Sequence, residues 1–220
     1  MKMNIGNELL QAEAARLAKA MTPQLDPKCV DPQDTTMSQD LAQIVATHAL
    51  GAAASGVGVA WLPGVGSTAA LAAMAGFIWS MYFRINYRLG LKFSKVVVKS
   101  LASAVLSNLT QAAVSVVGSV VVASLLSLTG IGNAASSLIM AALDYSVVMV
   151  GGILYLKLLN GLMHAGQDPA QMSPKEIEIK MQDVMRGENI EALLKQENRS
   201  YRMGRKNGTI TGNETVDLAD

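Results

Sequence analysis

Two long stretches without acidic or strongly basic side chains constrain what this chain can fold into. Residues Leu41 to Phe83 contain no Asp, Glu, Lys or Arg, and neither do residues Ser100 to Leu143. A helix on the surface of a soluble protein needs a charged or polar face toward water, so uncharged runs of this length favour helices in lipid. The sequence therefore predicts an all-α integral membrane protein.

Each uncharged stretch divides at a turn-forming sequence. We expect helices at about residues 40–61, 67–84, 100–129 and 134–159, which form two helical hairpins within a membrane-embedded domain of residues 40–163. Gly51, Gly76 and Ser80 belong to rows of small residues that let the first pair approach closely. The hairpin turns are built around Pro63, Gly64, Gly66, Gly130 and Gly132.

A basic segment joins the two hairpins. It contains five cations and no acid, which is typical of an interfacial helix on anionic headgroups; a solvated turn between spans is the alternative. Trp79, Tyr82 and Tyr87 precede or enter this segment, where an aromatic belt is expected. The positive-inside rule then places both termini in the cytoplasm. The predicted headgroup contacts are Arg84, Arg88, Lys92, Lys95 and Lys99.

The two hairpin turns carry no charge, so moving them into or through a bilayer costs little. Two interpretations follow. The hairpins either cross the membrane fully or stop inside it as wedges, and a wedge in one leaflet favours curved membrane.

Several polar side chains lie inside the predicted spans. Asp144 is expected to be hydrogen-bonded or protonated between helices, with Gln111 and Ser115 as partners; lining an ion or proton path and starting a helix at the membrane surface are the alternatives. His48 is expected to be structural and level with Asn108, because a single histidine without acidic neighbours makes neither a metal site nor a catalytic pair. Residues at four-residue spacing on one helix, from Ser103 to Ser127, indicate either close packing or the wall of a hydrated path.

The flanking regions are more polar. Residues 1–39 predict an amphipathic helix at Asn7–Ala20 and a linker with three prolines, and residues 164–203 predict cytoplasmic helices. Ser173-Pro174-Lys175-Glu176 has the pattern of a capping box. Residues 204–220 are a polar tail, expected to be flexible unless a neighbour orders it.

The composition argues against several functions. The net charge of +1 offers no field for nucleic acid, and Cys29 is the single cysteine. Gly56-Val57-Gly58 lacks the context of a phosphate-binding loop. We expect no enzymatic activity, no cofactor and no metal.

The residues 47–54, Thr-His-Ala-Leu-Gly-Ala-Ala-Ala, then Leu62-Pro63-Gly64, then 77–90 through Tyr87 and Gly90, resemble the YcjF-type bacterial membrane domain of unknown function. The resemblance covers about residues 40–163. It implies a helical domain in the bacterial inner membrane that works beside a small GTPase.

The sequence favours a self-associating structural scaffold or membrane-shaping protein, with the lipid bilayer and other copies of itself as partners. An oligomeric pore, lined by the serine row and Asp144, and a membrane adaptor for a GTPase are the alternatives.

Overall fold

The computed structural model describes residues 7–21, 35–55, 68–127 and 134–218, and all regular structure in these ranges is helical. The prediction of an all-α fold is therefore confirmed. The turns around Pro63, Gly64, Gly66, Gly130 and Gly132 lie outside the described residues. The helices are α1 (Glu8–Met21), α2 (Thr35–Ala54), α3 (Thr68–Leu89), α4 (Lys95–Ser127), α5 (Ala134–His164), the 3-10 turn η3 (Pro169–Gln171), α6 (Pro174–Arg186) and α7 (Ile190–Lys206).

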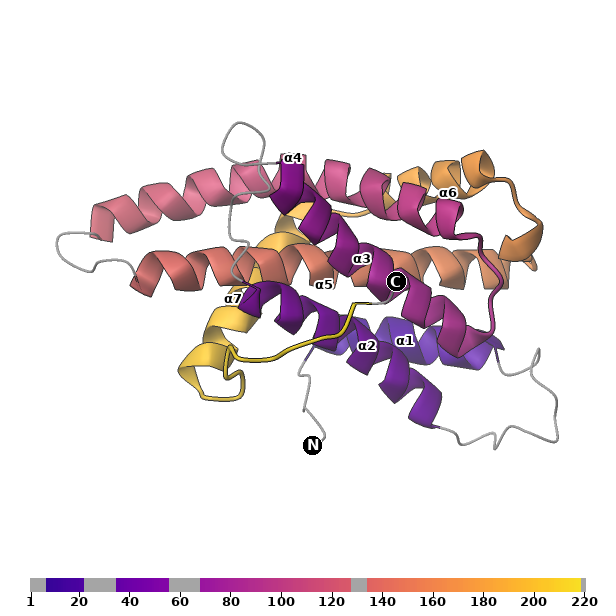
Figure 1. The fold of residues 1–220 in the computed structure, drawn as a ribbon, viewed down its shortest axis with the longest axis horizontal. Coiled ribbons are helices and arrows are strands. Elements are labelled where there is room, and N and C mark those ends of the chain that lie inside the picture. The colour runs from indigo at the N-terminus through magenta and orange to yellow at the C-terminus, as the bar shows by residue number, and fades with distance from the viewer. Residues whose placement is uncertain (1–6, 22–34, 56–67, 128–133, 219–220) are drawn as a thin grey trace.

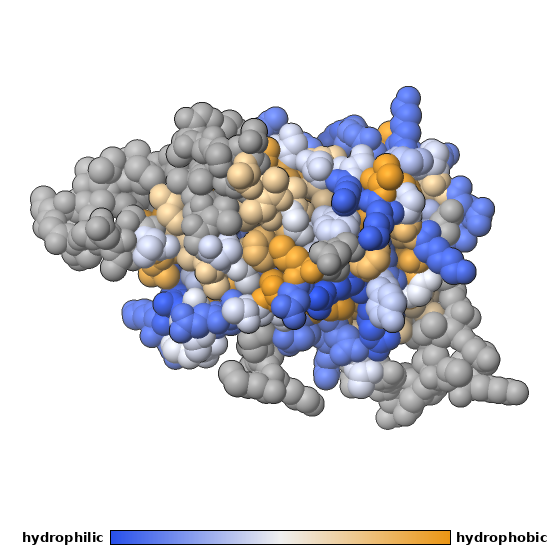
Figure 2. All heavy atoms as spheres, viewed as in Figure 1, coloured by the Kyte–Doolittle hydropathy of each residue, from blue (hydrophilic) through white to orange (hydrophobic). Residues whose placement is uncertain are grey.

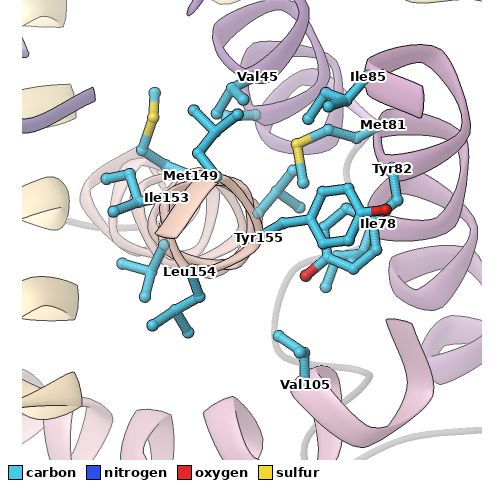
Figure 3. Packing of buried hydrophobic residues seen from close by; sticks show 14 of the residues in the cluster. Val45, Ile78, Met81, Tyr82, Ile85, Val105, Met149, Ile153, Leu154 and Tyr155 are labelled. Carbon is cyan, nitrogen blue, oxygen red and sulfur yellow. The ribbon is translucent and has the colours of Figure 1, made fainter. Parts of the chain in front are cut away.

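Helix α5 is the centre of the bundle and contacts each of the other described α-helices. Its side chains are apolar around nearly the whole circumference, and a helix of that kind is buried on all sides. Met149, Ile153 and Leu154 are fully buried although they point in different directions from the helix axis (Figure 3). Figure 1 shows α4 running alongside α5, while α3 crosses in front of it.

A glycine of α5, Gly152, allows α2 and α3 to approach α5 closely. A Cβ added at Gly152 would lie 2.4 Å from Val45 of α2 and 3.0 Å from the sulfur of Met81 of α3. Beside this contact, Tyr155 of α5 stacks on Tyr82 of α3 with ring centroids 3.9 Å apart (Figure 3). The close approach depends on glycine because a larger residue would push both helices outward.

The amphipathic helices α1, α6 and α7 complete the same core. Leu10 and Leu17 of α1 are fully buried, as are Met181 of α6 and Leu194 of α7. The predicted capping box at Ser173 is confirmed, since the Ser173 side chain and the Glu176 side chain each bond the backbone of the other. The segments flanking the apolar helices therefore pack on them.

One helix among the described residues is long and apolar enough to cross a membrane, the stretch Ser137–His164 within α5. Most of it is covered by other helices of the bundle. Length and hydropathy would also describe the central helix of a soluble helical bundle.

Candidate membrane-binding surface

Each of the four apolar helices has an uncharged end next to one of the two predicted hairpin turns. Helix α2 ends at Ala54 and α4 at Ser127, whereas α3 begins at Thr68 and α5 at Ala134. In Figure 1 the ends of α4 and α5 project at the far left beyond the rest, while α2 ends left of centre and α3 begins near the middle. We call the projecting ends of α4 and α5 the uncharged end. Exposed apolar side chains on the approach to it include Leu71 and Val114.

Helix α7 runs antiparallel to α5 and stops short of the uncharged end. Glu188, just before α7, pairs with Lys157 of α5 at 2.5 Å, and Tyr201 packs on Tyr145 with ring centroids 5.0 Å apart. From Tyr145 to the first residue of α5, Ala134, the helix extends about 17 Å. Because α7 continues for five residues past Tyr201, to Lys206, it follows α5 for about 7.5 Å beyond Tyr145, and about 9 Å of uncharged α5 projects beyond α7.

Hydrophilic and apolar side chains are also separated on the surface. Figure 2 shows apolar residues gathered in the middle of one face, with hydrophilic residues along its lower edge and at the end opposite to the projecting hairpin. The exposed cations of α7 include Arg199, Arg202 and Lys206. These cations are carried by the helix that ends beside the base of the projecting hairpin (Figure 1).

The five cations predicted to bind headgroups lie toward the opposite end of the bundle, where α3 ends and α4 begins. Arg88 pairs with Asp40 at 2.8 Å, and Lys99 lies 4.7 Å from the centre of the Trp79 ring. Arg84 donates to the backbone oxygen of Asp217 at 2.5 Å. These three cations have contacts inside the chain, and Lys92, Lys95 and Lys99 are exposed. Headgroup binding by the five cations stays a prediction.

The expected aromatic belt is wrong for Tyr82. This side chain is fully buried, and its hydroxyl donates to the backbone oxygen of Gly151 at 2.9 Å. Burial is possible because that bond satisfies the hydroxyl while the ring stacks on Tyr155. Tyr87 is 84% exposed, and Val96 beside the same cations is 74% exposed.

Asp144 is fully buried, and its charge acts on Tyr201 of α7. Burial raises the pKa of Tyr201, and the negative charge of Asp144 is among the contributions that add to this rise. The predicted partners Gln111 and Ser115 are exposed on α4 and do not enclose the carboxyl group. Periodicity gave the depth of Asp144 along its helix but not the direction in which it points.

His48 is buried between α2 and α3. Its Nδ1 lies 2.8 Å from the backbone oxygen of Ile44, and its Nε2 lies 3.2 Å from the hydroxyl oxygen of Ser80. Asn108, expected at the same level, is exposed and donates to Ala104 of its own helix. The pairing of His48 with Ser80 fixes the register of the first hairpin and matches a structural role.

Two buried polar contacts escaped the sequence analysis. Asn160 of α5 donates to the backbone oxygen of Glu13 at 3.1 Å and to its carboxylate at 2.9 Å. Glu197 of α7 is fully buried near Asn7, and no hydrogen bond of good geometry reaches either carboxylate oxygen. Burial raises the pKa of Glu197 to about 7, against a smaller lowering by the Asn7 amide.

Within the described ranges no three His, Cys, Asp or Glu side chains come together in a way that could hold a metal ion. No protein-family model, curated protein or solved structure matches the chain. The functional inference therefore rests on the geometry of the chain.

Proposed function

We propose that this chain is a non-enzymatic membrane-embedded protein that assembles from several copies into a structural scaffold or membrane-shaping component. The uncharged end enters the cytoplasmic leaflet of a bacterial membrane as a wedge, while both termini stay in the cytoplasm. The observation that supports the proposal is that the uncharged ends of α4 and α5 project beyond the other helices.

The length of the projecting part favours entry into one leaflet. About 9 Å of α5 projects beyond the end of α7, which is less than half of a hydrocarbon core, about 15 Å. A deeper position would carry the C-terminal end of α7 into hydrocarbon together with Arg202, Arg205 and Lys206, which is costly for charged side chains. A wedge of this depth displaces lipid from one leaflet and so favours curvature.

The cations of α7 then lie near the headgroups. Each cation near an anionic surface contributes about 1 kcal/mol of attraction. Replacing Arg199, Arg202 and Lys206 by Gln should weaken binding to phosphatidylcholine vesicles containing one quarter phosphatidylglycerol by roughly tenfold to a hundredfold. Flotation or sedimentation of the vesicles measures this loss.

A matched variant removes the same charge at the other end, with Gln at Lys92, Lys95 and Lys99. The wedge predicts a smaller loss for this variant. An environment-sensitive label on Leu71→Cys, in a Cys29→Ser background, should report an apolar surrounding on binding, whereas a label on Val96→Cys should not. Equal insertion of both labels would contradict the wedge.

Full crossing by the hairpins is the second candidate. Exposed Tyr87 and Val96 beside Lys92 have the character of a membrane interface, which favours headgroup contact at the basic end. In that arrangement α1 and α7 would have to leave α5. The test places cysteines at Gly64 and Gly132 and adds an impermeant thiol reagent on the far side of closed vesicles. A reaction would support full crossing and contradict the wedge.

Two further functions are less well supported. A pore lined by Asp144 conflicts with the burial of that residue inside one bundle, although Ser103, Ser107, Gln111 and Ser115 do form an exposed row on α4. Planar-bilayer conductance lost in Asp144→Asn but kept in Val121→Ala would support a pore. The resemblance to a GTPase-associated domain proposes an adaptor role, which a pull-down through residues 173–202 tests.

A further inference from the structure

The C-terminal segment, residues 207–218, leaves α7 and turns back over the bundle. The backbone N–H groups of Thr209 and Ile210 both donate to the carbonyl of Gly204. Glu214 then accepts bonds from the backbone N–H groups of Thr211 and Gly212, at 2.8 Å each. Figure 1 shows the segment crossing α2 and ending over α3. The sequence predicted a tail that a neighbour would have to order, and α2 and α3 are that neighbour.

The segment fits a shallow apolar site between α2 and α3. A Cβ added at Gly51 would lie 2.4 Å from Val216 and 3.5 Å from the ring of Phe77, and one added at Gly76 would lie 3.9 Å from Leu218. The small residues predicted to bring the two helices together thus admit the tail. We call the surface formed by Gly51, Gly76 and Phe77 the tail site.

Few side chains hold the C-terminal segment, residues 207–218, on the tail site. Val216 is half-buried, Leu218 is 42% exposed, and the backbone oxygen of Asp217 accepts the bond from Arg84. Burying two aliphatic side chains in part contributes a few kcal/mol at most. Ordering an extended segment costs roughly 1–2 kcal/mol per residue in backbone entropy, so these two apolar contacts alone do not hold the segment on the bundle.

The tail site belongs to the face of α3 that leads to the uncharged end. One to two turns before Gly76 on the same helix, Leu71 and Ala72 are exposed. The segment that covers the site contains Glu214 and Asp217 but no Lys or Arg. An anionic lipid surface repels such a segment and attracts the cations of α7 beside it.

We infer that the tail site is a lipid-docking face of α2 and α3, and that residues 207–218 cover it until the bundle meets a bilayer. The inference rests on the proposed membrane function, and it adds that the C-terminal segment regulates membrane binding. While residues 207–218 cover the tail site, the exposed apolar surface of α3 ends where this segment begins. When the tail leaves, Gly51, Gly76 and Phe77 extend that surface along the first hairpin.

A disulfide that locks the cover provides the test. In a Cys29→Ser background, Cβ atoms at Gly51 and Val216 would be 3.1 Å apart, within a small shift of the usual spacing of about 3.8 Å. We expect the oxidised Gly51→Cys/Val216→Cys protein to bind vesicles with one quarter phosphatidylglycerol at least fivefold more weakly than its reduced form. The two single-cysteine variants should not respond to reductant.

A second variant keeps the test independent of the lock. Ending the chain after Asn207, or replacing Val216 and Leu218 by Ser, should strengthen vesicle binding while the helix content measured by circular dichroism is unchanged. Equal binding by wild-type, locked and truncated proteins would overturn the cover and leave the proposed function intact. Truncation that enlarges the particle in solution without strengthening vesicle binding would assign the site to a second copy. Absence of binding by every form would overturn both proposals.

Discussion

Tyr82 and Tyr155 stack with a 13° angle between their ring planes, and their hydroxyls take different partners. Tyr82 donates to the backbone oxygen of Gly151, whereas Tyr155 donates to the Oδ1 of Asn86 at 2.7 Å. The stack joins the third and fifth helices through one aromatic contact and two buried hydrogen bonds. The two hydroxyls are not equivalent. If its bond to the tyrosine is lost, the Gly151 oxygen keeps another hydrogen bond, whereas the Asn86 oxygen does not.

Replacing Tyr155 by Phe should therefore cost more than replacing Tyr82. Without Tyr155, the buried Asn86 side chain has no partner for Oδ1, and its Nδ2 is already without one. The Gly151 oxygen still has its helical bond. We expect a loss of about 2 kcal/mol of unfolding free energy for Tyr155→Phe and about 1 kcal/mol for Tyr82→Phe. Denaturant unfolding followed by circular dichroism measures both, and exposed Tyr87→Phe is the control. A reversed order would refute the assignment.

The hydrogen bonds of Asn160 should hold α1 on α5. Asn160→Asp keeps the shape but places a carboxylate against the backbone oxygen and carboxylate of Glu13, so we expect about 2–3 kcal/mol of destabilisation. Hydrogen exchange across Glu8–Met21 should accelerate before exchange in α5. The same change at exposed Asn108 adds the same charge and should leave exchange in α1 unaltered. Unchanged protection of α1 in Asn160→Asp would contradict this role.

Glu197 should make stability depend on pH. Its pKa is about 7 in the folded chain, against 4.5 as its ordinary value, so the folded state binds the extra proton between these pH values. The stability is complete below about pH 4.5 and falls as the pH rises through about 7, by about 3 kcal/mol.

The Glu197→Gln variant should lose this part of the pH dependence. Unfolding free energies at pH 5 and pH 8 for wild type and variant measure the difference. Exposed Glu191, which pairs with Lys195, supplies the control as Glu191→Gln. Parallel pH profiles for wild type and Glu197→Gln would show that the carboxyl group titrates normally.

Two glycines of α5 should respond to alanine in opposite directions. The Cβ of Gly152→Ala would meet Val45 at 2.4 Å, so overpacking should cost about 1–3 kcal/mol. At Gly161 the Cβ would have nothing within 4 Å, and Ala should stabilise the helix by up to about 1 kcal/mol. Thermal unfolding midpoints measure both. A stabilised Gly152→Ala would mean that α2 and α3 approach α5 less closely than the structure shows.

Much of the local structure was predictable from sequence. The period of apolar residues gave the helices, and Ser173 and Gly187 gave the ends of α6, because these signals act within a few residues. The predicted start at Asp40 was late, since α2 begins at Thr35. The preceding residues have no apolar period, so pattern alone could not extend the helix.

The long-range contacts were not predictable. Tyr155 bonds a residue 69 positions away, and Asn160 bonds one 147 positions away. Periodicity gives a face and a depth but not the neighbour on that face. For the same reason, Gly51 was assigned to contact with a helix, and the structure places Val216 against it.

The central position of α5 has a consequence during synthesis. Helix α5, which contacts all the other described α-helices, is synthesised after four of them, and more than a hundred residues separate it from α1. Until α5 is synthesised, the apolar helices α2, α3 and α4 lack the helix on which they pack, which makes the nascent chain prone to aggregation. Handover to a chaperone or an insertion machinery before translation ends would protect it.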